Sequence, residues 1–202
     1  MKKAIIALLL SMLFSYMMPL NAWADIPVPS TSNKPVKLIQ PGEGETFQVG
    51  GDFINFKTLS EGVLGELSVI QVTAAPQSGP ALHKHPPEVF SIVDGEFEFY
   101  SARLEDTLKA KAGDFVRIPS GAPHAYKNVG TTPGKYVLIT AMAGDPEQLW
   151  FQKFEYEMSQ QLGTPIVNGK PVQKGSTANT AKSLDNKEMV EIARKYGIEF
   201  LQ

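Results

Sequence analysis

Short runs of alternating hydrophobic and polar residues, bounded by glycine, proline, asparagine and aspartate, occupy the chain from Val36 onward. Alternation with a period of two places successive side chains on opposite faces of an extended strand. Closely spaced runs of this kind are typical of an all-β sandwich or barrel. The pattern predicts seven strands: Phe53–Leu59, Glu66–Thr73, Val89–Val93, Glu96–Tyr100, Asp114–Ile118, His124–Asn128 and Lys135–Ala143.

The dipeptide Asp94-Gly95 separates two of these runs. Both residue types tolerate the positive φ of a tight hairpin turn, so the two runs are predicted to pair as a hairpin. Such a turn would fix the register of the flanking aromatic and aliphatic residues, because a slip by one residue would turn each of them to the other face. The predicted pairing sets Phe97 and Phe99 against Phe90 and Ile92.

After Gly144 the hydrophobic period changes to that of a helix. The first predicted helix carries Leu149, Trp150, Phe154 and Met158 on one face and ends near Gly163. The segment 164–183 is rich in glycine, proline, threonine and asparagine, which predicts a loop or linker. A last helix presents Met189, Ile192, Ala193 and Tyr196 as its apolar stripe and ends at Gly197.

The first residues do not fit a barrel. Lys2 and Lys3 precede an apolar run, and Ala22-Trp23-Ala24 is a small-x-small cleavage site. This order predicts a signal peptide over 1–24 and an exported protein, periplasmic or secreted; a retained membrane anchor is the alternative. The predicted organisation is then a lead-in over 25–45, a β-barrel over 46–144 and a C-terminal helical extension over 145–202.

Composition narrows the functional classes. The chain has 202 residues, of which 43% are hydrophobic and 20% charged, as expected for one globular domain. It has no cysteine, so neither a disulfide framework nor a lipoprotein attachment point is available. Cleavage after Ala24 would remove two lysines and shift the formal net charge from -2 to -4. A mildly acidic protein without a basic patch is not expected to bind nucleic acid. Cleavage of the signal peptide would also leave the protein without a stable membrane anchor.

All three histidines fall into two spaced motifs. The first is His83-Lys84-His85 followed by Glu88, and the second places His124 after Gly113, Pro119 and Gly121 and before Asn128. Residues two apart on a strand share a face, so His83 and His85 can point into one cavity. Three imidazole nitrogens and one carboxylate oxygen can hold a divalent first-row metal while leaving coordination positions open. The alternative is that these histidines are buried and satisfied by hydrogen bonds, or lie on the surface without a role.

Period-two spacing also gives the first pocket candidates. Phe90 and Ile92 share the face of Glu88, and Tyr126 shares that of His124. Phe90 is as compatible with barrel core as with substrate stacking. Tyr126 is equally compatible with a hydrogen-bonded core residue and with a general acid beside the metal.

These paired motifs resemble those of the cupin family. The second motif, Gly113…Pro119-Ser120-Gly121…His124…Asn128, matches the family pattern at every fixed position, whereas the first is shorter in two places, between Gly79 and His83 and between His85 and Glu88. The upstream segment 41–44 and the C-terminal segment 192–201 are similar to single-domain bacterial cupins related to quercetin 2,3-dioxygenase. The resemblance implies an all-β fold, a single cupin barrel of the double-stranded β-helix or jelly-roll type with a C-terminal helical extension.

The resemblance further implies that His83, His85, Glu88 and His124 bind one divalent transition metal, which could be iron, manganese, nickel, cobalt or zinc. Glu88 would double as the base for an acidic substrate hydroxyl, and Tyr126 is a second catalytic candidate. The expected function is a metal-dependent dioxygenase acting on an aromatic or enolisable small molecule with dioxygen. A non-oxidative isomerase or lyase, and a non-catalytic binding protein with a structural metal, are the alternatives. Association into a homodimer is left open.

Overall fold

The computed structural model describes residues 36–59, 67–101, 107–141, 149–172 and 186–201. The chain divides into Met1–Leu38 and Ile39–Gln202, and every strand and helix below belongs to the second unit. The predicted signal peptide at 1–24, the lead-in as far as residue 35 and the linker residues 173–183 lie outside the described residues.

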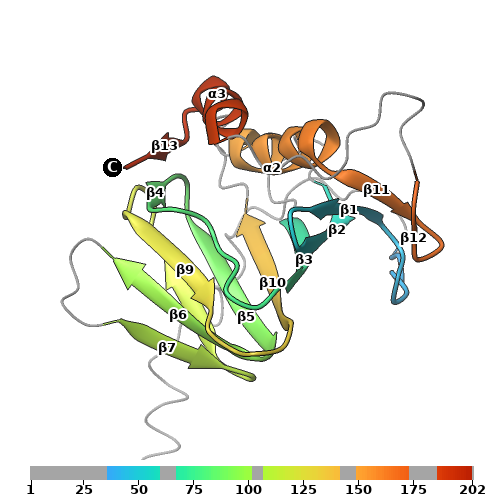
Figure 1. Cartoon of the computed structure of the whole chain (residues 1–202), viewed down its shortest axis with the longest axis horizontal. Coiled ribbons are helices and arrows are strands. Elements are labelled where there is room, and N and C mark those ends of the chain that lie inside the picture. The colour runs from blue at the N-terminus through green and yellow to red at the C-terminus, as the bar shows by residue number, and fades with distance from the viewer. Residues whose placement is uncertain (1–35, 60–66, 102–106, 142–148, 173–185, 202) are drawn as a thin grey trace, which may run out of the picture. The chain divides into compact units, whose positions relative to one another are not determined.

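Two antiparallel sheets form the body of the second unit (Figure 1). The larger has the order β12-β11-β1-β2-β3-β10-β5-β8 and the smaller the order β13-β4-β9-β6-β7. The strands of the larger sheet are β1 (Glu45–Val49), β2 (Asp52–Thr58), β3 (Leu67–Ala74), β5 (Glu88–Asp94), β8 (Phe115–Ile118), β10 (Gly134–Ala141), β11 (Thr164–Val167) and β12 (Lys170–Pro171). Those of the smaller sheet are β4 (His83–Lys84), β6 (Glu96–Ser101), β7 (Leu108–Lys111), β9 (His124–Asn128) and β13 (Glu199–Phe200). The predicted all-β fold is confirmed.

The core follows from the alternation in the sequence. In β3 every second residue is buried, namely Ser68, Ile70, Val72 and Ala74. The aromatic rings of the two sheets meet between them: Phe90 of β5 lies 5.1 Å from Phe99 of β6, measured between ring centroids. Aromatic pairs at this spacing add to the burial energy of each ring, so the period-two pattern both forms the strands and fills the space between the sheets.

The predicted hairpin at Asp94-Gly95 is wrong in its pairing. β5 pairs with β8 and β10, whereas β6 pairs with β7 and β9 in the other sheet. Gly95, at a φ of 87°, turns the chain from one sheet to the other instead of joining two partners. The backbone at Gly95 also leaves no room for a side chain, since a Cβ there would lie 2.8 Å from the Cα of Gly134. Across the core, Phe99 therefore faces Phe90 and Phe97 faces Tyr136, instead of pairing with β5 in one sheet.

The first part of the predicted linker is also different. Residues 164–171 form β11 and β12, and β11 extends the larger sheet by pairing with β1. The turn between them is Asn168-Gly169, with φ values of 51° and 72°. Two consecutive positive φ values suit a two-residue hairpin turn, for which Asn-Gly is a strong sequence signal.

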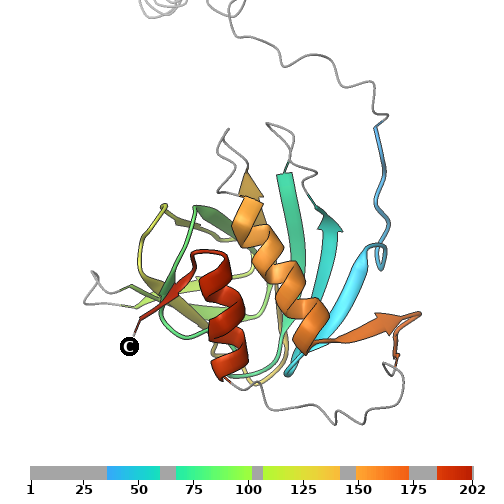
Figure 2. The same cartoon turned by 90° about the horizontal axis from the view of Figure 1, so that it is seen from above.

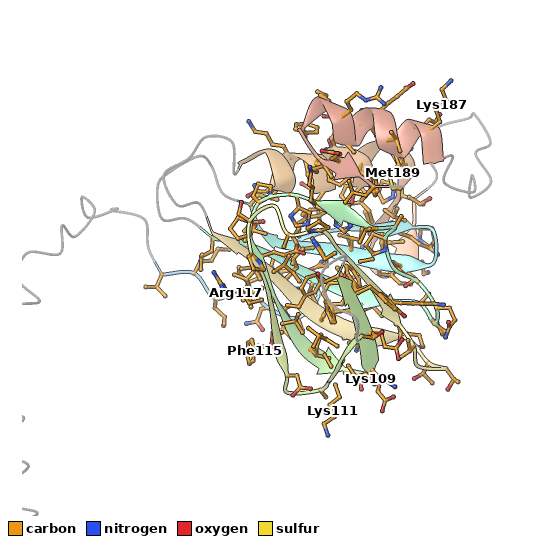
Figure 3. The ribbon with its side chains drawn as sticks, turned by 90° about the vertical axis from the view of Figure 1, so that its left-hand side faces the viewer. Lys109, Lys111, Phe115, Arg117, Lys187 and Met189 are labelled. Carbon is orange, nitrogen blue, oxygen red and sulfur yellow. The ribbon has the colours of Figure 1, made fainter. Side chains whose placement is uncertain are left out.

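Two helices, α2 (Leu149–Leu162) and α3 (Asn186–Lys195), lie together over one face of the strands (Figure 2). Phe154 and Met158 of α2 are buried, as are Ile192 and Ala193 of α3, which confirms the predicted stripes at these positions. Figure 3 shows Met189 directed towards the barrel and Lys187 directed away from it. Lys195 of α3 forms an ion pair of 2.6 Å with Glu157 of α2 and so ties the helices together. Neither of these two described helices combines the length and apolarity needed to cross a membrane.

Candidate metal centre and adjoining cavity

The three histidines converge in the smaller sheet. His83 in β4 lies directly opposite His124 in β9, and His85 follows β4. One ring nitrogen from each histidine falls within 4.8 Å of those of the other two. All three side chains are buried, with exposures between 2% and 6%. The predicted convergence of two motifs on one point is therefore present in the fold.

Backbone carbonyls fix the orientation of every ring. The Nδ1 atoms of His83, His85 and His124 lie 2.8, 2.6 and 2.9 Å from the carbonyl oxygens of Ala81, Pro86 and Ala122, respectively. A carbonyl oxygen can only accept, so each Nδ1 carries the proton and donates it. The Nε2 atoms of the three rings are the ones left to meet inside the cluster. This is the arrangement in which metal-binding histidines are held by their surroundings.

Glu88 completes the cluster from β5 of the other sheet. Its Oε1 lies 3.0 Å from Nε2 of His124 and 3.4 Å from Nε2 of His85. Two ligands bound about 2.1 Å from one ion, at angles of about 90° to 109°, lie roughly 3.0–3.4 Å apart. The separations of Glu88 from these two imidazoles therefore equal those between neighbouring ligands of a single metal ion.

The protonation of the cluster also favours a cation. Burial, and then the adjacent His124 and His85, lower the pKa of His83 to about 4, so the ring is neutral at pH 7. Burial alone would raise the pKa of Glu88, but its interactions with His124 and His85 outweigh burial and hold the pKa below its usual value of 4.5. The 3.0 Å contact between Nε2 of His124 and Oε1 of Glu88 is a hydrogen bond when the ring carries a proton on Nε2, and a metal ion can take the place of that proton. Three nitrogens and one carboxylate oxygen suit a divalent first-row transition metal.

The remaining motif residues shape the backbone around these ligands. The N–H of Gly121, at a φ of 68°, donates to the carbonyl of His85 at 2.9 Å and so joins the two motifs. Asn128 is fully buried, and its Nδ2 donates to the carbonyls of Ala74, Ala75 and Thr132 while its Oδ1 accepts from the N–H of Gly130. Asn128 therefore holds the end of β9 and takes no part in the ligand cluster.

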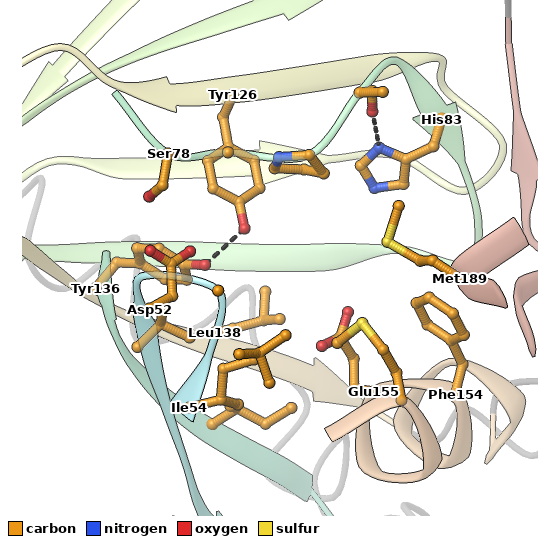
Figure 4. A pocket seen from close by; sticks show the side chains of 18 of the residues that line it. Asp52, Ile54, Ser78, His83, Tyr126, Tyr136, Leu138, Phe154, Glu155 and Met189 are labelled. Carbon is orange, nitrogen blue, oxygen red and sulfur yellow. Dashed lines mark hydrogen bonds between the residues drawn. The ribbon is translucent and has the colours of Figure 1, made fainter. Parts of the chain in front are cut away.

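A cavity of about 600 Å³ adjoins the cluster, and His83 and Glu88 form part of its wall. Figure 4 shows His83 and Tyr126 on one side of it and Phe154 and Glu155 of α2 on the other. Much of the remaining wall is aliphatic or aromatic: Ile54, Ile70, Val72, Phe90, Leu138, Met158 and Met189. Of the three predicted pocket residues, Phe90 and Tyr126 line the cavity. Ile92 does not line this wall but lies buried in the core, beside Tyr136 in the sheet.

Two tyrosines form the polar feature of the cavity farther from the histidines. The hydroxyl groups of Tyr126 and Tyr136 are 2.6 Å apart (Figure 4). Burial raises the pKa of both hydroxyls well above 10, so both stay protonated at neutral pH. The side chain of Tyr126 is half-buried and lines the cavity. Tyr126 can therefore act as a hydrogen-bond donor or a weak acid towards a bound molecule, but does not carry a negative charge.

Sequence reasoning missed Glu155. Its carboxylate projects from α2 into the cavity, across from the histidine cluster (Figure 4). Burial, and then the charge of Glu88, raise its pKa to about 8. The signal was a charged residue inside an apolar helical stripe, since Glu155 follows Phe154 and precedes Met158 by three positions.

Comparison with known proteins identifies one family model and a number of similar solved structures. The family model of the cupin domain matches residues 70–140. Among solved structures, the chain is similar to a cupin-like protein from Thermotoga maritima, at 19% identity over 48% of this chain and 72% of that one, with a TM-score of 0.41. An RmlC-like cupin from Shewanella frigidimarina is 19% identical over 51% and 87%, with a TM-score of 0.42. A polyketide cyclase from Streptomyces resistomycificus is 12% identical over 55% and 82%, with a TM-score of 0.46.

No curated protein matches the chain. The family model spans the strands from β3 to β10, which include the residues of both histidine motifs. The chain therefore carries a cupin domain, and that domain holds a cluster of three buried histidines able to bind a metal ion.

Proposed function

We propose that the protein is an exported, metal-dependent cupin dioxygenase that acts on an aromatic or enolisable small molecule. The observation that carries this proposal is the position of the cluster: the three histidine rings have fixed orientations, and two of the four candidate ligands, His83 and Glu88, line a largely apolar cavity. His83, His85, His124 and Glu88 would hold the ion. When bound, a divalent metal would supply Lewis-acid polarisation of a substrate oxygen and, if redox-active, a path for electrons to dioxygen.

The residues of the chain would perform the other tasks. Glu88 is ionised at neutral pH, so it can accept the proton of an acidic substrate hydroxyl if it reaches that group. Phe90 presents an aromatic ring to the cavity and contacts Tyr126 at a centroid distance of 5.0 Å, which gives a planar substrate a surface against which to pack. The apolar wall would exclude water from the reacting atoms.

The first test measures the metal before any activity. The chain from residue 25 onward is purified without added metal and analysed for its elements beside a His83→Ala/His124→Ala double variant and an exposed control, Lys111→Ala. We expect about one equivalent of metal in the wild type and the control and none in the double variant. Equal metal content in all three proteins, or no metal in the wild type, would refute the ligand assignment.

The second test measures oxygen uptake with a panel of flavonols, catechols and diketones, after loading with iron, manganese, nickel or cobalt. The proposal expects uptake with at least one class of substrate and its loss in the double variant. The absence of oxygen uptake with every substrate and every metal would refute the dioxygenase function.

A non-oxidative isomerase or lyase is the second candidate, and the protonated Tyr126 hydroxyl inside the cavity favours it. Turnover without oxygen consumption, lost in Tyr126→Phe with ligand binding retained, would support this function. The third candidate, a structural metal in a binding protein, expects a cavity blocked by side chains, and the volume beside His83 speaks against it. A protein that unfolds when its metal is chelated, and that shows no turnover when the metal is bound, would favour this third candidate.

A further inference from the structure

We propose that Glu155 determines the specificity of the cavity: its carboxyl group binds a hydroxyl group of the ligand and disfavours ligands that carry a carboxylate. The inference rests on the proposed function only in treating this cavity as the site of a small molecule. It concerns the wall supplied by α2, separate from the metal ligands in the two sheets.

The first argument is position. Glu155 lies between Phe154 and Met158 on the side of α2 that packs over the strands, and all three residues line the cavity. In Figure 4 its carboxylate points into the cavity, towards the side from which Tyr126 and His83 enter. Glu157, two positions along α2, differs from Glu155 in having a cation as its partner, since its carboxylate lies 2.6 Å from Nζ of Lys195.

The second argument is the absence of a protein partner. No described residue forms a hydrogen bond or an ion pair with the carboxyl group of Glu155, and its charged neighbour is the like-charged Glu88. Leu138, Met158 and Met189 are among the apolar residues that line the same cavity. A carboxyl group in such surroundings is costly unless it finds a hydrogen-bonding partner. A ligand hydroxyl would provide one, because a hydroxyl can both donate and accept.

The third argument is the charge of the wall. Among the described residues that line the cavity there is no lysine or arginine, whereas Glu88, Glu155 and Asp52 are all acidic. A ligand carboxylate placed at the α2 side would therefore meet like charge or an apolar surface. A neutral hydroxyl there would meet a hydrogen-bonding group. Above its raised pKa of about 8, Glu155 itself carries the charge that opposes a ligand carboxylate; below that pH it is protonated and can donate to a hydroxyl.

The test uses three probes with the same apolar body: naphthalene, 2-naphthol and 2-naphthoate. Their dissociation constants are measured by fluorescence titration with the metal-free chain, so that coordination to an ion cannot contribute. The proteins are the wild type, Glu155→Gln, Glu155→Leu and the exposed α3 control Glu191→Gln. Thermal unfolding of each protein establishes that it is folded.

We expect the wild type and the control to bind 2-naphthol more tightly than naphthalene, and 2-naphthoate most weakly. Glu155→Leu should lose the preference for 2-naphthol over naphthalene, a change of about threefold to tenfold for one hydrogen bond. Glu155→Gln keeps a hydrogen-bonding group without an ionisable one, so it should retain most of that preference. At pH 8.5, where Glu155 of the wild type is ionised, the variant should also bind 2-naphthoate more tightly than the wild type.

Failure of 2-naphthol to bind the wild type, or an unchanged ratio in Glu155→Leu, would overturn the inference. The result is independent of the oxygen-uptake panel. Selective binding that depends on Glu155, with no oxygen consumption, would refute the dioxygenase function and support the specificity role of Glu155. Oxygen consumption with no effect of Glu155 on the binding of the probes would support the dioxygenase function and overturn the specificity role of Glu155.

Discussion

Replacing Glu155 with glutamine should change how the stability of the protein depends on pH. Burial, and then the charge of Glu88, raise the pKa of Glu155 from 4.5 to about 8. Between these two values the folded protein holds a proton that the unfolded chain has released. The folded state therefore loses stability, relative to the unfolded chain, as the pH rises from 4.5 towards 8. Glutamine does not titrate, so this loss should be absent from the variant.

The magnitude follows from the two pKa values. Each pH unit in this window is worth about 1.4 kcal/mol, so the complete loss is at most about 5 kcal/mol. Glu155 faces a cavity that can admit water, which reduces the cost of its charge. We therefore expect the free energy of unfolding of the variant to rise, relative to that of the wild type, by about 2–5 kcal/mol between pH 4.5 and pH 8.

The assay is urea unfolding of both metal-free proteins at pH 4.5, 5.5, 6.5, 7.5 and 8.5. Asp52, Glu88, His83, Tyr126 and Tyr136 also line the cavity, but they are present in both proteins and their own titrations largely cancel in the difference. Glu191→Gln serves as an exposed control and should follow the wild type at every pH. Parallel curves for Glu155→Gln and the wild type would refute the reasoning, because they would mean that Glu155 titrates normally in the folded state.

Three further predictions concern the framework and the N-terminus. Asn128→Asp places a carboxylate against three backbone carbonyls in a fully buried site. The substitution should lower the free energy of unfolding by about 3 kcal/mol or more. A loss below about 1 kcal/mol, measured by urea unfolding, would contradict this prediction. Gly79→Ala would set a Cβ 1.9 Å from the carbonyl oxygen of Tyr126, so it should reduce both thermal stability and metal content. Gly113→Ala, with positive φ but no atom within 4 Å, should affect stability mildly and leave metal content unchanged. Export predicts that N-terminal sequencing of protein from the periplasm or medium begins at Asp25, whereas an intact Met1 in the membrane fraction would indicate a retained anchor.

Local patterns in the sequence were sufficient for much of the fold. Period-two alternation located seven strands to within a few residues, because the alternation reflects the two faces of each strand and needs no knowledge of its partner. The same rule placed His83 and His85 on one face. The strand β11 and its turn were missed although Asn168-Gly169 signalled them, since the composition of the whole segment suggested a loop.

The tertiary structure alone decided which strands are partners and which side chains meet. Whether β6 pairs with β5 or crosses to the other sheet depends on contacts between residues far apart in the chain, and a turn residue such as Gly95 is compatible with both. The same long-range pairing sets His83 opposite His124 and brings Glu88 from the other sheet to within 3.0 Å of His124. It also turns Glu155 of α2 into the cavity and buries Ile92 away from it. The sequence by itself determined the residue types and the face of each strand, because these depend on local geometry; the partners were decided by the packing of the two sheets and the helices into one core.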